Sequence, residues 1–403
     1  MSKPPLLYLV HRIPYPPNKG DKVRSFNLLR HFARHYRVFL ATFIDDAADE
    51  QYVDALSQWC EAVHCERLSP RAARIGSLRG LATGEALTLA YYRSKPLADW
   101  VARVVAEQGI REAAVFCSAM MQYVEAHPEL STLADYCDVD SAKWLDYADK
   151  HHGPIAWIYR REGRKLLAYE RRAAGLARAV TFVSDAEAAL FRKLAPECAA
   201  AVHGISNGVD ADFFSADVSR ASPFDSATRA VVFTGAMDYW PNIDAVTWFA
   251  QEVWPALAEF DASLRFWIVG MNPSAQVLAL AQDSRIRVTG TVPDVRPYLQ
   301  YGAVVVAPLR IARGIQNKVL EAMAMARPVI ASPDAALGID ARDGEELLVA
   351  SDAPSYVSAI RGVLADAARA ARIGVAAREC VVTRYSWEAH LLKLVPLMQE
   401  RLA

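Results

Sequence analysis

The 403-residue sequence predicts an α/β protein built from two doubly wound domains with parallel sheets. Its length gives each of two domains enough residues for a core of its own. Short apolar runs alternate with helical patterns through both halves, as parallel sheets require. A polar, turn-rich stretch at residues 206–230 separates the halves. We therefore expect domains at residues 1–210 and 211–385, with residues 386–403 packing on the first domain.

The first half contains apolar runs that are typical of buried parallel strands. They lie at residues 6–10, 38–43, 113–117, 133–137 and 180–183. Helical periodicity at residues 23–35 and 96–107 supplies the crossover connections that parallel strands need. The second half repeats the pattern, with expected strands at residues 231–234, 264–269, 286–288, 303–307, 329–331 and 347–349.

The end of the chain predicts a helix with one apolar face. Apolar residues recur at helical spacing between residues 387 and 402. We expect this helix to cross back to the first domain. The alternative is a helix that caps the second domain alone.

Composition and charge narrow the class of protein. The chain has 45 basic and 46 acidic residues, a net charge of -1, so no nucleic-acid partner is expected. Its six cysteines lack C-x-x-C pairs, which indicates reduced thiols in a reducing compartment. The apolar run at residues 6–10 is too short for a signal peptide, and no run reaches the ~18 residues of a membrane span. We expect a cytoplasmic protein and leave contact with the inner face of a membrane open.

The segment after the expected strand at residues 303–307 is the most informative one. Gly314 suits a tight turn, and Gln316 or Asn317 suits the N-cap of a helix that runs to about residue 325. The amide groups at the start of such a helix attract an anion.

Lys318 and Glu321 are three residues apart, so they share one face of this helix. A lysine at a helix N-terminus suits a phosphate, and a carboxylate one turn deeper suits the hydroxyl pair of a ribose. The segment therefore predicts a site for a nucleoside diphosphate. The alternative is a helix start with a solvated lysine and glutamate. Ala326 stands where a left-handed glycine usually ends a helix.

Two loops of the first half are further candidates. Gly20 precedes the expected helix at residues 23–35 and permits close approach to a ligand, and Arg24 in its first turns would reach a phosphate or an acceptor. Asp138 and Asp140 follow the strand at residues 133–137 and would share one side if the strand continued. One of them would orient or deprotonate an acceptor hydroxyl; the alternative is that one caps the next helix through Ser141.

Three histidines rank lower as candidate bases, because a lone histidine is more often packed or simply exposed. They are His11, His151 and His152.

Several motifs together resemble glycosyltransferase family 4. They are the linker Ser206-Asn-Gly-Val-Asp210, the segment Val232-Phe-Thr-Gly-Ala236 and the LEAMA helix at residues 320–324. The resemblance covers nearly the whole chain and implies the GT-B fold, in which two facing Rossmann-like domains hold the active site between them. It implies that the first domain binds the acceptor and the second binds a nucleotide-sugar donor.

A narrower resemblance is to the sugar transferase group associated with the exosortase/PEP-CTERM system of Gram-negative bacteria. It rests on YLVHRIPYPPNKGDKVRS at residues 8–25, CDVDSAKW at residues 137–144 and TGAMDYWPN at residues 234–242. In that group the product is taken to be an exopolysaccharide.

The family resemblance implies roles for the loop before the helix at Lys318. The backbone amides of Gly314, Ile315 and Gln316 would bind the donor, with Lys318 on the phosphates and Glu321 on the ribose. A related pattern, G-x-x-N-K-x-x-E, includes Asn317.

The chain departs from the family in two places. Arg313 replaces the first of two loop glutamates, which leaves the donor sugar open, and Arg313 or Arg310 would instead add positive charge. Relatives place basic residues after the glycine that corresponds to Gly235. Here Asn242 or Tyr239 would contact the donor instead.

Gly290-Thr-Val-Pro293 resembles the loop whose backbone touches the nucleotide base, so Val292 is assigned there.

We therefore expect a hexosyltransferase that moves a sugar from a nucleoside diphosphate sugar to a glycan or lipid-linked acceptor. The resemblance implies retention at the anomeric carbon, and no metal or other cofactor is expected. Catalytic roles fall on Asp138, Asp140 and Lys318. The alternatives are a nucleotide-sugar epimerase of similar fold and a non-catalytic nucleotide-sugar-binding subunit.

Two basic stretches of the first half permit two interpretations. An anionic membrane face would attract them, or they form solvated helix faces balanced by Glu162 and Glu170. They comprise Arg67, Arg71, Arg74 and Arg79, and then Arg160, Arg161, Arg164, Lys165, Arg171 and Arg172.

Overall fold

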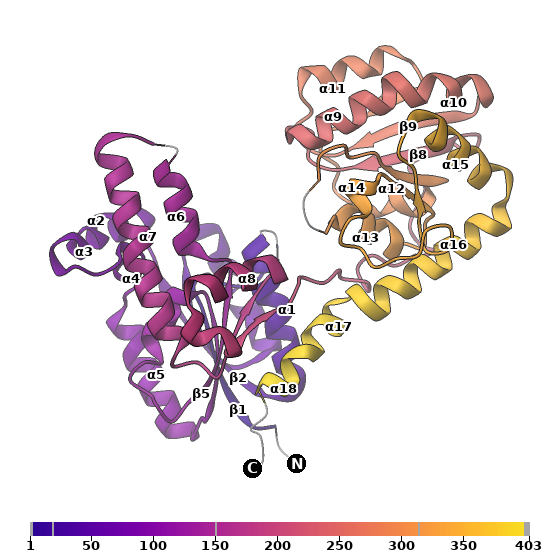
Figure 1. Ribbon diagram of the computed structural model, residues 1–403. Coiled ribbons are helices and arrows are strands. Elements are labelled where there is room, and N and C mark those ends of the chain that lie inside the picture. The colour runs from indigo at the N-terminus through magenta and orange to yellow at the C-terminus, as the bar shows by residue number, and fades with distance from the viewer. Residues whose placement is uncertain (1–2, 18–19, 150, 313–314, 399–403) are drawn as a thin grey trace. The chain divides into compact units, whose positions relative to one another are not determined.

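The computed structural model describes residues 3–17, 20–149, 151–312 and 315–398. The chain forms two compact units (Figure 1). Unit 1 comprises Met1–Asn207 together with His390–Ala403, and unit 2 comprises Gly208–Ala389. None of the described helices is long and apolar enough to cross a membrane.

Unit 1 is built on a parallel sheet of seven strands in the order β3-β2-β1-β4-β5-β6-β7. The strands are β1 (Pro5–Val10), β2 (Arg37–Ile44), β3 (Cys60–Arg67), β4 (Glu112–Phe116), β5 (Ser131–Cys137), β6 (Ala179–Phe182) and β7 (Val202–Gly204). The sequence predicts five of them.

The two strands of unit 1 that the sequence does not predict lie at the edges of its sheet. β3 has a mixed pattern because most of its residues are only partly buried, and β7 has three residues. Edge strands are covered on fewer sides, so they lack the continuous apolar run of a central parallel strand.

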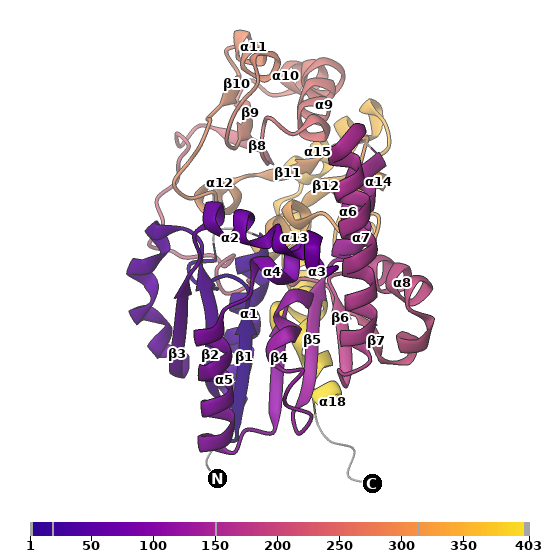
Figure 2. The ribbon, with the colours of Figure 1, turned by 90° about the vertical axis from the view of Figure 1, so that its left-hand side faces the viewer.

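Helices cover both faces of this sheet (Figure 2). The α-helices that connect its strands along the chain are α1 (Gly20–His35), α2 (Pro70–Ser77), α3 (Arg79–Thr83), α4 (Leu87–Tyr91), α5 (Lys95–Gln108), α6 (Asp140–Asp149), α7 (Gly153–Ala174) and α8 (Asp185–Leu194). Short 3-10 turns connect several of these elements.

Unit 2 has a parallel sheet of six strands in the order β10-β9-β8-β11-β12-β13. The strands are β8 (Arg229–Thr234), β9 (Leu264–Val269), β10 (Ile286–Val288), β11 (Val304–Ala307), β12 (Val329–Ala331) and β13 (Leu348–Val349). All six coincide with predicted runs. β8 and β11 are almost wholly buried, as expected of central strands with helices on both faces.

The described α-helices of unit 2 that precede Trp387 connect these strands or follow the last one. They are α9 (Trp240–Trp248), α10 (Trp254–Phe260), α11 (Ala275–Ala279), α12 (Arg296–Tyr301), α13 (Asn317–Ala324), α14 (Pro333–Ala336), α15 (Ala353–Ala365) and α16 (Ala367–Cys380).

The final segment is not one continuous helix. α17 (Trp387–Leu391), a 3-10 turn and α18 (Val395–Met398) follow one another. α18 lies against β5 in unit 1, and Arg178 Nη1 donates a hydrogen bond to the carbonyl of Met398 at 3.1 Å. The apolar periodicity therefore indicates which residues are covered, while the local helix type follows the packing.

α13 ends as its sequence predicts, with a left-handed residue that is not glycine. Ala326 has a φ of 54°, and its N–H donates to Met323 O while the next N–H donates to Ala322 O. A side chain in this conformation costs on the order of 1 kcal/mol relative to glycine.

We expect Ala326→Gly to stabilise unit 2 by about 1 kcal/mol, because glycine adopts this φ without steric cost. Chemical and thermal denaturation measure the change in stability. For a domain of this size, the midpoint temperature of thermal unfolding should rise by a few degrees. The control is Ala324→Gly, inside α13, which should destabilise by a similar amount. If the Ala326→Gly variant were less stable than the wild type, the assigned backbone strain at Ala326 would be wrong.

Candidate functional site

The strand order of unit 2 reverses between β8 and β11. Strands β9 and β10 lie beyond β8, and β12 and β13 lie beyond β11. The connections that leave the carboxyl ends of β8 and β11 therefore turn to opposite faces and open a crevice, where doubly wound sheets bind ligands. Gly235 follows β8, and the loop after β11 leads to Lys318.

Gly235 brings backbone close to two polar side chains. A Cβ on Gly235 would lie 2.8 Å from Lys318 Nζ and 2.8 Å from Asn242 Nδ2. A Cβ on Gly270, which follows β9, would lie 1.6 Å from Gly235 O. These contacts require glycine at both positions, because any side chain would displace the lysine or the loop.

Lys318 is held in one position at this crevice. Its Nζ donates a hydrogen bond to Asn242 Oδ1 at 2.5 Å and lies 4.3 Å from the centre of the Phe233 ring. Asn242 is buried, and its Nδ2 donates to Ala236 O at 2.8 Å. Since the amide is fixed by the loop after β8, it orients the ammonium that α13 supplies.

Burial lowers the pKa of Lys318 to about 7, and the nearby Glu321 opposes this effect. Burial raises the pKa of Glu321, which Lys318 in turn lowers. The lysine is thus partly neutral near pH 7 without a ligand. A bound anion beside Nζ would favour the ammonium form.

The residues before Lys318 form the start of α13. Gln316 is the N-cap residue in an extended conformation, and no side chain caps the first turn in the described part of this loop. Ile315 is half-buried and Asn317 is exposed. The predicted roles of Arg313 and Gly314 fall outside the described residues.

Two other candidates of unit 2 lie near the carboxyl edge of its sheet. Arg310 Nε donates to Asp244 Oδ2 at 2.9 Å, so its charge is paired within the protein. Val292 is half-buried and follows the turn at Gly290, which has a φ of 68°. Nothing in the described structure assigns Val292 to a base, so this role stays a prediction.

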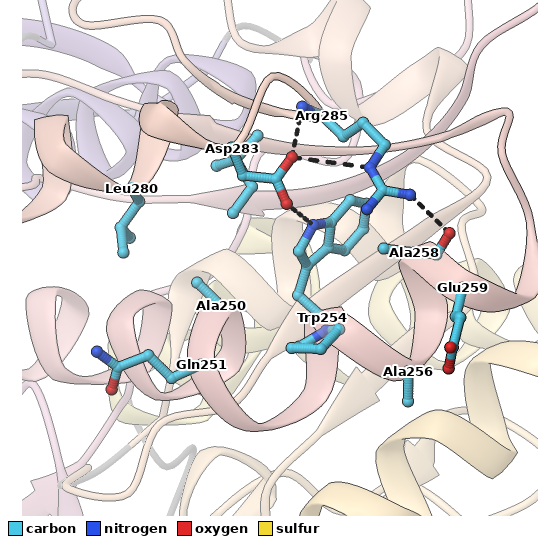
Figure 3. A pocket seen from close by; sticks show the side chains of 11 residues that line it. Ala250, Gln251, Trp254, Ala256, Ala258, Glu259, Leu280, Asp283 and Arg285 are labelled. Carbon is cyan, nitrogen blue, oxygen red and sulfur yellow. Dashed lines mark hydrogen bonds and ion pairs between the residues drawn. The ribbon is translucent and has the colours of Figure 1, made fainter.

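A separate pocket of unit 2 is not a candidate nucleotide site. Figure 3 shows Trp254, Asp283 and Arg285 in its wall, where Trp254 Nε1 donates to Asp283 Oδ2 at 3.0 Å. Asp283 and Arg285 precede β10, so they lie at the amino edge of the sheet. Ligands of doubly wound sheets bind at the opposite edge.

In unit 1 the structure corrects the prediction for Arg24. The side chain is buried, and its Nη2 and Nε contact both carboxylate oxygens of Asp135, at 2.7 to 3.1 Å. Its Nη1 donates to Ile205 O and to Asn207 Oδ1 at 2.9 and 2.8 Å. Arg24 therefore ties α1 to β5 and to the segment after β7. The sequence could not show this, because the buried partner Asp135 is 111 residues away.

Asp138 and Asp140 come together in a different way from the one predicted. The strand ends at Cys137, whose φ of 64° turns the chain, so the two side chains do not alternate along a strand. Lys143 Nζ bridges them instead, at 2.8 Å from Asp138 Oδ2 and 3.1 Å from Asp140 Oδ1. Burial lowers the pKa of Lys143, but Asp140 and Asp138 raise it above its ordinary value.

The alternative that one of these aspartates caps the next helix through Ser141 is not what the structure shows. Asp140 is the first residue of α6, and Ser141 Oγ donates to Glu170 Oε2 at 2.5 Å. Val139 N donates to Glu187 Oε2 at 2.8 Å. Both aspartates instead form ion pairs with Lys143, at the carboxyl end of β5.

Glu170 is a buried carboxyl, whereas its sequence context predicts a charge on a solvated helix face. Burial raises its pKa to about 8, against the lowering effect of the Ser141 hydroxyl, and Asp140 raises it further. Its carboxylate accepts a hydrogen bond from Ser141, the second residue of α6, and so stabilises the start of that helix. Among the lower-ranked histidines, His11 stacks on Phe116 with ring centres 5.7 Å apart and lies 3.5 Å from Asp21, while His151 and His152 are exposed.

Comparisons with known proteins agree with this geometry. Residues 228–366, which lie in unit 2, match the family model described as glycosyl transferases group 1. None of the curated proteins matches the sequence.

Solved structures resemble the entire chain. Anabaena HepE in complex with UDP has 15% identity and a TM-score of 0.60, over 98% of this chain and 99% of that one. A Rickettsia africae glycosyltransferase has 13% identity and a TM-score of 0.61, over 99% of this chain and 98% of that one. Sucrose-phosphate synthase from Thermosynechococcus elongatus has 19% identity and a TM-score of 0.59, over 98% of each chain. The chain therefore has the GT-B fold.

We expect Arg24→Gln to destabilise the protein by roughly 3–5 kcal/mol, because it leaves the Asp135 carboxylate buried without its partner. Urea denaturation measures this loss. Arg103→Gln, at an exposed position of α5, is the control and should change stability by less than about 0.5 kcal/mol. If Arg24→Gln kept full stability and lost only ligand affinity, the assigned structural role would be wrong.

The affinity for a nucleoside diphosphate should fall as pH rises above 7. The free protein then holds a neutral Lys318, which must take up a proton when the anion binds. We expect about a tenfold loss per pH unit between pH 7 and 9, with close to one proton taken up per ligand, measured by calorimetry in buffers of different ionisation heat.

Lys318→Arg is the matched control for this pH dependence. Arginine keeps its charge throughout this range, so the affinity of the variant should be nearly independent of pH. A wild-type affinity that did not change between pH 7 and 9 would contradict the role of Lys318.

Proposed function

We propose that the protein is a glycosyltransferase that moves a sugar from a nucleoside diphosphate sugar to a glycan or lipid-linked acceptor. The observation that carries this proposal is the position of Lys318, at the switch point of a domain that matches the glycosyl transferases group 1 model. HepE was solved with UDP and with UDP-glucose, so a uridine diphosphate sugar is the first donor to test.

The proposed chemistry is stabilisation of the departing diphosphate. Negative charge develops on its oxygens as the bond to the sugar breaks, and the Lys318 ammonium with the amides at the start of α13 would neutralise it. Glu321, one turn further along α13, would accept hydrogen bonds from the ribose hydroxyls. Since these groups balance the charge, we propose a reaction that needs no metal ion.

The acceptor side is assigned to unit 1. Asp138, Asp140 and Lys143 form a charged cluster at the carboxyl end of β5, where an acceptor hydroxyl would be oriented. Retention at the anomeric carbon and a role in exopolysaccharide synthesis, within the exosortase/PEP-CTERM group, are further parts of the proposal. They follow from the resemblance of residues 8–25, 137–144 and 234–242.

A cytoplasmic location completes the proposal. All six cysteines are free thiols, as a reducing compartment favours.

Donor binding is tested with a thermal-shift panel of uridine, guanosine and adenosine diphosphates and their sugar conjugates. The matching nucleotide at about 100 times its dissociation constant should stabilise the protein by about 2.7 kcal/mol. Lys318→Gln should abolish this shift and lower sugar transfer by roughly 10²–10³-fold. Lys193→Gln, at an exposed position of α8, is the control and should keep both.

The same assay separates the rival functions. Turnover of the donor sugar into its epimer without any acceptor would identify an epimerase. A nucleotide shift with no transfer to any glycan or lipid-linked acceptor would indicate a binding subunit. No shift with any nucleotide would contradict the proposed function altogether.

A further inference from the structure

The segment formed by α2 and α3 exposes apolar side chains in a regular row. Ile75, Leu78 and Leu81 are 72%, 51% and 38% exposed and are spaced three residues apart. Leu78 joins α2 to α3 in a helical conformation, so the row continues along one side of both helices. Single exposed leucines are common, but a row of three on one short segment marks an interaction surface.

The same segment is strongly basic. Residues 67–84 contain four arginines and no acidic residue. Arg67 forms an ion pair with Glu50. Arg71, Arg74 and Arg79 are exposed and have no ion pair within the described ranges. The apolar row is thus flanked by three arginines whose charge the protein itself does not balance.

α7 is joined to this segment and has an exposed aromatic residue near the junction. Arg161 Nη2 donates to Gly80 O at 2.5 Å and to Glu85 O at 3.1 Å, which ties α7 to α3 (Figure 1). Trp157 lies one turn before Arg161 and is 60% exposed. Tryptophan beside arginine is typical of surfaces that enter the interface of a bilayer.

The second basic stretch differs from this surface. Arg160, Arg171 and Arg172 form ion pairs with Asp149, Glu197 and Glu125. Charge that the protein already neutralises contributes little to binding a membrane. Arg164 and Lys165 are exposed and have no ion pair among the described residues, so the second stretch is neutralised only in part.

We propose that Ile75, Leu78 and Leu81, flanked by Arg71, Arg74 and Arg79, form a docking surface for an anionic phospholipid bilayer. We call it the α2–α3 surface. Arginines attract acidic headgroups, and the apolar row enters the boundary of the acyl chains. A polyanion such as a nucleic acid would satisfy the charges but would leave the apolar row in water, so a bilayer fits both features.

The position of the α2–α3 surface suits an enzyme with a lipid-linked acceptor, although the surface itself does not depend on the proposed reaction. α2 follows β3 and α6 follows β5, so both begin at the carboxyl edge of the unit 1 sheet. The Asp138–Asp140–Lys143 cluster lies at the same edge. A bilayer docked on the α2–α3 surface would therefore present its lipids on the side of unit 1 where ligands of doubly wound sheets bind.

Sedimentation with vesicles tests the proposal on the full chain. Wild-type protein should sediment with vesicles of phosphatidylcholine and phosphatidylglycerol, but not with phosphatidylcholine alone, and raised salt should release it. Arg71→Gln/Arg74→Gln should weaken binding by about thirtyfold. Ile75→Ser/Leu78→Ser keeps the charge and should still weaken binding at least about tenfold.

Two controls separate docking from other effects. Leu278→Ser on α11 removes a leucine that is also 51% exposed, and Arg103→Gln removes an exposed arginine of α5. Both should bind vesicles like wild type. The nucleotide thermal shift of each variant reports folding and donor binding, so loss of vesicle binding is distinguished from failure of the proposed reaction.

Three results would overturn the inference. The first is no sedimentation with anionic vesicles at low salt, and the second is equal binding to neutral vesicles. The third is wild-type binding by Ile75→Ser/Leu78→Ser together with full competition by heparin, which would identify a site for polyanions instead of a bilayer.

Discussion

The hydrogen bond between Lys318 and Asn242 is the interaction on which the proposed donor site depends. It joins the start of α13 to the start of α9, the helix that follows β8, on the two sides of the point where the strand order reverses. Gly235 makes the approach feasible because no side chain intervenes. Burial lowers the pKa of the ammonium because it removes water from it, while the face of the Phe233 ring lies 4.3 Å from Nζ. A group held in this way is preorganised for an anion, since little has to move when the ligand replaces water.

Arg24 shows the opposite use of a cation. Both residues lie near the start of a helix that follows a loop at a sheet's carboxyl edge, so their sequence contexts are alike. Arg24 donates hydrogen bonds to the Asp135 carboxylate, the Ile205 carbonyl and the Asn207 side-chain oxygen, and its charge stabilises the fold. Lys318 Nζ donates a described hydrogen bond to one amide oxygen and lies over a ring, with the Glu321 carboxyl nearby, which leaves its ammonium able to bind a ligand. The number and charge of the partners separate a structural cation from one suited to binding.

The two units also differ in how their carboxyl edges are built. In unit 2 glycines at 235 and 270 permit close backbone packing. In unit 1 the turn after β4 and the end of β5 contain Cys117 and Cys137, with φ values of 80° and 64° that are costly for residues with side chains. Such strained residues are frequent at functional sites. The turn at Cys137 ends β5, and Lys143 then gathers the two aspartates that follow.

The sequence by itself determined the alternation of strands and helices, the six strands of unit 2, and the positions of Lys318 and Glu321 on one helix. Local periodicity and turn residues are enough for these, because they depend on neighbours along the chain. Only the tertiary structure decided that Arg24 is paired, that Asn242 holds Lys318, and which arginines of the two basic stretches have ion-pair partners among the described residues. Each of these depends on partners far apart in sequence. A residue's type shows its chemistry, but the burial and the charges around it decide whether that chemistry is used for the fold or for a ligand.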